Sequence, residues 1–176
     1  MSDEFDAVFD RFTSTAFRLE TLDRYGSEEE DAELALYLAG QPLPEYSPRT
    51  DPWLKRVAAT TVAGKRWQRV HVVSRPLSDY LRLELLGYEG NVAAGEDVRI
   101  ADREADPAVG GLRRDFWIFD AETPRPFVML LRYDAEGRLL SFDTTADHQV
   151  VEQCRGERDL ALAWSVPLAE YAARQA

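Results

Sequence analysis

A few carboxylates near one predicted strand are the side chains best suited to acid–base chemistry. Asp115 and Asp120 bracket four consecutive apolar residues, and Asp143 follows in the next predicted hairpin. Two carboxylates act as general acid and general base when both face the same cleft. Residues at the two ends of one strand do not share a cleft, which argues against a pair of Asp115 and Asp120. These carboxylates, with Arg75 or Arg99 steering an anion, define an alternative hypothesis of a hydrolase or nuclease.

Histidine and cysteine are too sparse to build a metal site or a nucleophilic triad. His71 and His148 are far apart, and neither has a second histidine or a cysteine within one helical turn, as a zinc site requires. Cys154, the single cysteine, falls within a predicted helix, where we expect a small buried residue and not a reactive thiolate. Gly64 precedes Lys65 but lacks the upstream glycine of a phosphate-binding loop. The sequence therefore predicts no metal and no cofactor.

The basic residues form the other candidate site, because charge is unevenly distributed along the chain. The net charge is −11, and residues 1–50 hold twelve acidic and four basic residues, whereas residues 51–82 hold seven basic and two acidic ones. An acidic protein repels phosphates, which disfavours direct nucleic-acid binding. The basic segment either pairs with the acidic N-terminal part, inside one chain or across a homodimer, or binds a protein partner or an anion. The candidates for that binding are Lys55, Arg56, Arg69, Arg75 and Arg82.

Size and composition indicate one soluble globular domain. The chain has 176 residues, of which 45% are hydrophobic and 11% aromatic, enough to exclude a disordered chain and to build one core. The longest apolar runs are far too short to span a bilayer. The N-terminus is acidic where a secretory signal would be basic, and one lone cysteine fits a reducing compartment. We expect a cytoplasmic protein that does not contact membranes.

The first half of the chain carries the marks of three helices and two strands. Phenylalanines at helical spacing predict a short helix over residues 5–12, and apolar residues alternate with polar ones over 17–21, as in a half-buried strand. Helices are expected over 28–39, capped by Ser27, and from Asp51 to Gly64. A strand over 67–73 follows. The proline-rich segment 41–50 is expected to form the longest loop before residue 100 and to be the best internal hinge.

The second half continues with further strands and helices around one strong strand signal. Residues 115–120 place four apolar side chains between carboxylates, the pattern of a central strand covered on both faces. The other expected elements are a helix over 78–88, a strand over 96–101, a hairpin over 126–144 and a helix over 147–164. Pro167 interrupts the chain before a last helical turn.

These elements predict an α/β (α+β) fold with a single mixed β-sheet of about five to six strands flanked by helices. An N-terminal helical segment would precede the sheet, and a C-terminal helix would close it. The expected organisation is a single domain, 1–176, with an acidic helical N-terminal part (1–50) and an α/β core (51–176). The sequence predicts that the polar residues able to do chemistry are dispersed over the molecule and not gathered in one cleft.

Several sequence blocks together resemble an actinobacterial domain family of unknown function. The blocks that carry this resemblance are DPWL (51–54), RVHVVSRPLSDYLRLEL (69–85), NVAAGEDVRI (91–100), DFWIFD (115–120) and RDLALAWSVPLAEY (158–171). The resemblance implies that such domains are often encoded beside Xre-type helix-turn-helix regulators. It implies no activity.

The order of elements is also similar to one lobe of a phospholipase-D-like domain. That superfamily works through a His-x-Lys motif, yet His71 is followed by Val72 and Val73, and His148 by Gln149 and Val150. The resemblance therefore implies a version without catalytic residues, of the kind used for sensing or docking.

The leading hypothesis is a non-catalytic regulatory domain that binds a protein partner. The partner implied by the resemblance is a helix-turn-helix regulator, contacted by the basic segment 51–82 or by the acidic N-terminal helices. Two alternatives stay open. One is the hydrolase or nuclease described above, and the other is a small-molecule sensor with a pocket between the sheet and its helices.

Overall fold

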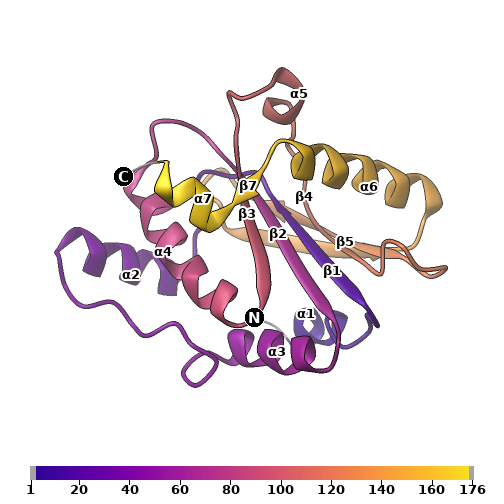
Figure 1. Cartoon of the computed structure of the whole chain (residues 1–176), viewed down its shortest axis with the longest axis horizontal. Helices are drawn as coiled ribbons and strands as arrows, with labels where there is room; N and C mark the ends of the chain where they lie inside the picture. The colour runs from indigo at the N-terminus through magenta and orange to yellow at the C-terminus, as the bar shows by residue number, and fades with distance from the viewer. Residues whose placement is uncertain (1–2, 175–176) are drawn as a thin grey trace.

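One seven-stranded mixed sheet forms the centre of the protein (Figure 1). The computed structural model describes residues 3–174. The strand order is β6-β5-β4-β1-β2-β3-β7, in which β1, β2 and β3 run parallel and the other neighbours pair antiparallel. The strands are β1 (Thr15–Glu20), β2 (Arg66–Val73), β3 (Glu96–Asp102), β4 (Asp115–Phe119), β5 (Phe127–Tyr133), β6 (Leu139–Thr145) and β7 (Val166–Pro167).

The helices begin where side chains satisfy their first free amide groups. Ser27 accepts from the amide of Glu30, Asp51 caps the next helix, and Ser78 caps the one after β2, as the sequence predicted. The helices are α1 (Asp3–Val8), α2 (Glu28–Leu38), α3 (Pro52–Val62), α4 (Asp79–Ala93), α5 (Pro107–Gly110), α6 (His148–Ala163) and α7 (Leu168–Ala173).

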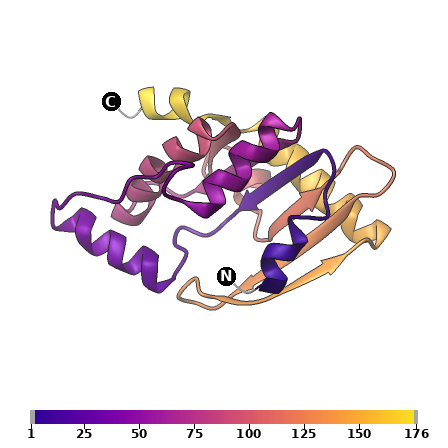
Figure 2. The ribbon, with the colours of Figure 1, turned by 90° about the horizontal axis from the view of Figure 1, so that it is seen from below.

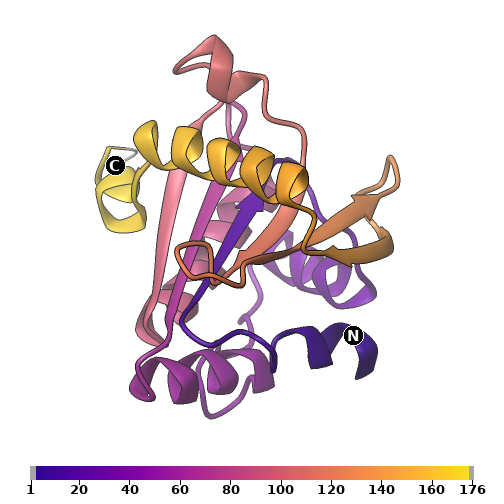
Figure 3. The same ribbon diagram turned by 90° about the vertical axis from the view of Figure 1, so that its right-hand side faces the viewer.

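Helices cover both faces of the sheet. On one face, Phe17, Val70 and Phe116 pack with Val151 and Cys154 of α6, which crosses the strands in Figure 3. The opposite face packs against α1, α3 and α4. Because both faces are covered, every side chain in the middle of β1, β2 and β4 enters an interior, whichever way it points.

Aromatic rings fill one end of the second face. Phe9 lies 5.1 Å from Trp117 and 5.5 Å from Phe119 between ring centroids, and Trp53 lies 5.3 Å from Trp67. Most of these pairs meet edge to face, the arrangement that aromatic quadrupoles favour. The aromatic cluster ties α1 and α3 to the sheet and forms one wall of the cavity described below.

The predicted fold class is confirmed, with three differences of detail. The sheet has seven strands and not five or six, because the two residues of β7 pair with β3 in a strand too short to show a pattern. The loop after β3 contains the four-residue helix α5. The strand predicted over 17–21 is β1, which lies in the middle of the sheet between β4 and β2, so the sheet is not confined to residues 51–176.

Candidate functional site

Two arginines face each other in the middle of the sheet. Arg18 on β1 is the direct partner of Arg69 on β2 in the parallel register, so both side chains point to the face that carries α3 and α4. Their exposed fractions are only 3% and 8%. Two buried positive charges on neighbouring strands repel each other and lose hydration, so the fold must supply anions beside them.

Two carboxylates neutralise Arg18. Its Nη2 donates to Oδ2 of Asp115 over 2.7 Å, and its Nε lies 3.5 Å from Oε1 of Glu20. Asp115 is further held by the amide (3.0 Å) and hydroxyl (2.6 Å) of Thr21 and by the hydroxyl of Tyr25 (2.5 Å). Every oxygen of Asp115 therefore has a donor, and this carboxylate is part of the structure and not a free acid.

Arg69 joins two further carboxylates. Its Nη1 donates to both oxygens of Glu20 over 3.0 Å, and its Nε donates to Oε1 of Glu96, also over 3.0 Å. Asn91 on α4 donates to the other oxygen of Glu96 over 2.6 Å. We call the five charged residues of this network the buried charge cluster: Arg18, Glu20, Arg69, Glu96 and Asp115.

His71 lies beside the buried charge cluster, opposite Glu20 in the register of β1 and β2, and is fully buried. Its Nδ1 is 2.9 Å from the hydroxyl of Tyr88, which in turn donates to Glu20 over 2.7 Å, and its Nε2 is 2.8 Å from the carbonyl oxygen of Leu22. Burial lowers the pKa of His71, and the negative charge of Glu20 opposes that change only in part. Both ring nitrogens are engaged, so His71 positions Tyr88 and does not line the cavity.

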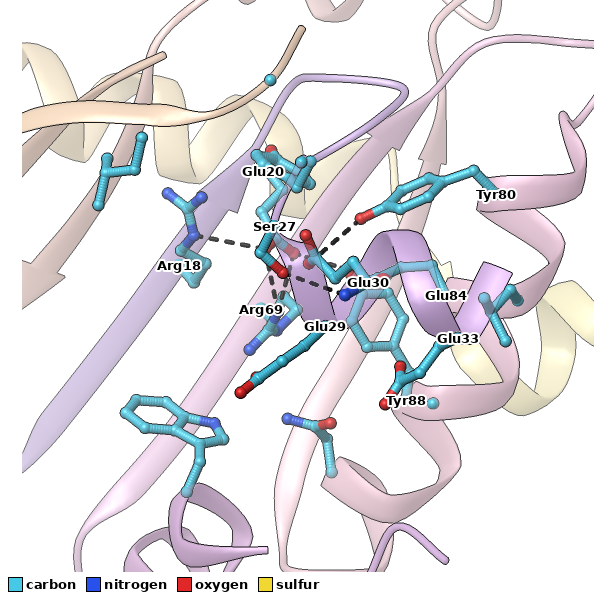
Figure 4. Close-up of a pocket in the computed structure, with 18 of the residues that line it drawn as sticks. Arg18, Glu20, Ser27, Glu29, Glu30, Glu33, Arg69, Tyr80, Glu84 and Tyr88 are labelled. Atoms are coloured by element: carbon cyan, nitrogen blue, oxygen red, sulfur yellow. Dashed lines mark hydrogen bonds and ion pairs between the residues drawn. The ribbon is translucent and has the colours of Figure 1, made fainter. Parts of the chain in front are cut away.

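A cavity of about 700 Å³ opens above the buried charge cluster, between the sheet and α2, α3 and α4. Arg18 and Arg69 form part of its floor, and Trp53 and Trp117 part of its aromatic wall. Figure 4 shows Arg18 at one side, with Tyr80 and Glu84 of α4 at the other. We call this space the central cavity. It combines apolar walls with a few fixed polar groups, which is the usual character of a small-molecule site.

Two glutamates of the central cavity have strongly shifted pKa values, in opposite directions. Burial alone would raise the pKa of Glu20, but the positive charges of Arg69 and Arg18 outweigh burial and lower it to about 2. Burial raises the pKa of Glu84 to about 7, and the charge of Glu20 adds to this effect. Titratable groups shifted in this way within a cleft are typical of functional sites.

A family model gives the chain its place among known proteins. The model for the domain of unknown function DUF6879 matches residues 3–173, almost the whole chain. The chain belongs to that family. This confirms that the chain belongs to a domain family of unknown function. The sequence blocks as marks of the family, an actinobacterial origin and a neighbouring helix-turn-helix gene stay predictions. No curated protein matches the chain.

The carboxylates predicted as a hydrolytic site lie apart from one another. Asp115 belongs to the buried charge cluster, and Asp120, at the other end of β4, accepts hydrogen bonds from Thr13, Ser14 and Thr15. Asp143 on β6 is exposed and pairs with Arg132 over 3.1 Å. The same three carboxylates therefore do not surround one cleft. Within residues 3–174, no group of histidine, cysteine, aspartate and glutamate could hold a metal ion.

The basic residues predicted to bind a partner or an anion are distributed over several surfaces. Lys55 and Arg82 are exposed, whereas Arg56 pairs with Asp10 over 3.1 Å. Arg75 pairs with Asp102 over 3.0 Å, and Arg69 lies inside the protein. The pairs of Arg56 and Arg69 join the basic segment to acidic residues of the first twenty positions, as one of the two sequence interpretations expected. Partner binding by this set stays a prediction.

The expectation that charged side chains are dispersed is wrong for the first strands of the sheet. Arg18, Glu20 and Glu96 were not among the predicted site residues, and Arg69 was predicted to bind a partner or an anion. The available signal was the alternation in β1, where Arg18 and Glu20 alternate with Phe17 and Leu19. We interpreted that alternation as a half-buried strand, which was wrong because helices cover both faces of β1. The buried location predicted for Cys154 is confirmed, and no helix among residues 3–174 has the length and apolar content to cross a membrane.

The shifted pKa of Glu20 predicts acid sensitivity. A carboxyl group with a folded pKa near 2 stabilises the protein above its unfolded pKa near 4.5, and this stability is lost as the pH falls through the window between the two values. We expect the free energy of unfolding, measured with urea, to fall as the pH is lowered from 5 to 3. Over the whole window between the two pKa values, the loss would reach about 3 kcal/mol. Glu20→Gln should flatten that slope, and an unchanged slope would contradict this role of Glu20.

Proposed function

We propose that this protein is a non-catalytic regulatory domain that binds a small organic molecule in the central cavity and relays its presence to a protein partner. One observation carries the proposal, namely a cavity of about 700 Å³ with an aromatic wall and a floor of fixed charges. Small-molecule sites usually have volumes of about 300–1,000 Å³ and contain a few convergent polar groups.

The state of the polar groups favours binding over catalysis. Glu20 and Asp115 are held by several donors each, and both nitrogens of His71 are engaged. Groups fixed in this way orient a ligand well but cannot move a proton without breaking the buried charge cluster. Burial raises the pKa of the Cys154 thiol, which makes it a poor nucleophile.

Helix α2 supports the step from ligand to partner. None of its residues is buried, yet Glu29, Glu30 and Glu33 line the central cavity while Leu36 and Leu38 are exposed. Figure 2 shows α2 outside the layers formed by the sheet and the other helices. A helix with so little buried surface moves away from the rest of the protein at low free-energy cost. A ligand that contacts α2 therefore changes the position of this helix and the surface available to a partner.

A blocked cavity tests the binding step. A side chain added at Gly87, which lines the central cavity, starts in open space, and the same is true of Gly156 on the exposed side of α6. We expect Gly87→Phe to fill the cavity and Gly156→Phe to leave it open. In a thermal-shift screen of a metabolite library, compounds should raise the Tm of the wild type and of Gly156→Phe but not of Gly87→Phe. Compounds that stabilise all three proteins alike, or none at all, would contradict a binding function for this cavity.

A capture experiment tests the partner. Tagged protein should recover a protein in near-equal amount from the native host, with a helix-turn-helix regulator as the expected partner. A compound identified in the screen should change the amount recovered, and Lys55→Glu with Arg82→Glu tests the exposed basic residues. A monomer without any companion, with and without the compound, would contradict the regulatory part of the proposal.

Glu84 favours a second candidate function, acid–base catalysis on the bound molecule. A carboxyl group with a pKa of about 7 at the edge of a cavity can accept and return a proton near neutral pH. Mass spectrometry after incubation with any compound that binds would decide between the two functions. Conversion that is lost in Glu84→Gln indicates an enzyme, whereas unchanged compound indicates a sensor.

A further inference from the structure

The central cavity carries a large excess of negative charge. Seven carboxylates line it, against two arginines. Both arginines are already matched by carboxylates of the buried charge cluster, since Arg69 pairs with Glu20 and Glu96, and Arg18 with Asp115. The remaining carboxylates form no ion pair with an arginine or lysine of residues 3–174. Their mutual repulsion is a cost that a positively charged ligand would remove.

Three of these carboxylates meet hydroxyl groups of serine or tyrosine and no cation among the described residues. The hydroxyl of Tyr46 donates to Glu33 over 2.6 Å, and that of Tyr80 to Glu30 over 3.4 Å. Within residues 3–174, Glu30, Glu33 and Glu84 have no arginine or lysine at ion-pair distance. Carboxylates among aromatic rings are the groups that bind an organic ammonium ion, by charge and through the faces of the rings.

The opposite side of the cavity holds a buried donor without an acceptor. Arg18 lines the central cavity with its side chain only 4% exposed, and its Nη1 has no hydrogen-bond partner among the described residues. Its other two nitrogens are engaged by Asp115 and Glu20. A buried guanidinium nitrogen left unpaired is costly, and an acceptor oxygen of a ligand would satisfy it.

We propose that the ligand is a zwitterion whose ammonium group lies against Glu30 and Glu84, whose carboxylate accepts from Arg18, and whose apolar body lies along Trp53 and Trp117. This inference rests on the proposed binding function and assigns its ligand class. In Figure 4, Arg18 and Glu84 lie at opposite sides of the cavity, so the two charged groups of the ligand are separated by its body.

The raised pKa of Glu84 agrees with a role in binding an ammonium group. Besides burial, Glu20 on β1 and Glu30 on α2 raise this pKa, while Arg69 on β2 and the hydroxyl of Tyr88 on α4 oppose them. An ammonium group beside Glu84 favours the charged carboxylate and expels its proton. Binding should therefore release protons near pH 7 and strengthen as the pH rises from 6 to 8.

A matched ligand series tests the two charged ends separately. The probes are the ω-amino acids from glycine to 8-aminooctanoate, with the n-alkylamine and n-alkanoate of each chain length, titrated by calorimetry. For at least one length we expect the zwitterion to bind about tenfold more tightly than both of its matched analogues. Titrations in buffers of different ionisation enthalpy should reveal proton release for the zwitterion and the amine but not for the alkanoate.

Variants assign each end to its residue. Glu84→Gln places an uncharged side chain at a position that already favours a neutral carboxyl group. It should weaken the binding of the zwitterion and of the amine about tenfold and leave the binding of the alkanoate unchanged. Arg18→Lys should weaken the binding of the zwitterion and of the alkanoate but not the binding of the amine. Glu89→Gln, on the exposed side of α4, is the matched control and should change nothing. If Arg18→Lys fails to fold, the comparison of zwitterion with amine on the wild type still decides the role of Arg18.

The outcomes separate this inference from the binding function. An amine that binds as tightly as its zwitterion would show that Arg18 holds no carboxylate, and the zwitterion assignment would be wrong. Neutral or purely anionic compounds that stabilise the wild type and Gly156→Phe but not Gly87→Phe would overturn the ligand class and leave the binding function intact. If no compound of any class distinguishes those two variants, both proposals are wrong.

Discussion

Arg69→Met should lower the free energy of unfolding by about 3–5 kcal/mol at pH 7. The substitution keeps most of the side-chain volume but leaves Glu20 and Glu96, at 6% and 2% exposure, without the guanidinium that both contact. An uncompensated buried charge costs far more than the lost contact is worth, because it cannot regain hydration without opening the fold. Urea unfolding followed by circular dichroism measures the change.

Two comparisons make the Arg69 result specific. Arg132→Met removes an ion pair of similar length at the surface and should cost less than about 1 kcal/mol, because water replaces the lost partner. Addition of Glu20→Gln to Arg69→Met should restore part of the loss, since the buried charge disappears. If Arg69→Met and Arg132→Met destabilise the protein equally, the buried charge cluster does not have the energetic role assigned to it.

Asp120→Ala should destabilise the protein by about 3 kcal/mol, which would show a structural role for a residue first considered for catalysis. Its carboxylate accepts from the amide groups of Thr13, Ser14 and Thr15 over 2.7–3.0 Å and joins the entry of β1 to the end of β4. The amide donors cause the pKa of Asp120 to fall even though burial acts in the opposite direction. Loss of the carboxylate leaves several part-buried donors unpaired at once.

The backbone conformation of Asp120 suggests which variants to compare. Its φ of 51° lies in the left-handed region, which aspartate and asparagine tolerate better than alanine. Asp120→Asn should therefore cost clearly less than Asp120→Ala, and Asp143→Ala, at an exposed position, less than about 1 kcal/mol. Thermal and urea unfolding provide the values. Equal effects of the asparagine and alanine variants would contradict the dependence on acceptor oxygens and backbone conformation.

The buried charge cluster and the central cavity are best understood together. A sheet face in a protein of this size is usually apolar, yet here Arg18, Glu20 and Arg69 occupy its middle between two hydrophobic clusters. Apolar residues at these positions would often give equal or greater stability. The retention of charges beside a cavity supports a role in recognising a ligand, and the experiments above test that role directly.

Local sequence signals sufficed for most of the secondary structure. Ser27, Asp51 and Ser78 each start a helix, because a side-chain oxygen satisfies amide groups within the next three residues. Four apolar residues in a row located β4, whose residues are all buried. These signals depend on neighbours along the chain, so one sequence contains them completely. The short strand β7 escaped notice because its partner on β3 lies more than sixty residues away.

The sequence by itself determined the fold class, the first residues of the helices and the capacity to form one core, since these follow from periodicity, capping and composition. Only the tertiary structure decided that Arg18 and Arg69 face an interior, because alternating polar residues look the same whether water or a helix covers them. It also supplied Asp115, 97 positions from Arg18, and Glu96, 27 positions from Arg69, as the neutralising partners. Electrostatic interactions depend on distance in space, and that distance is set only when the strands have paired and the helices have closed over them.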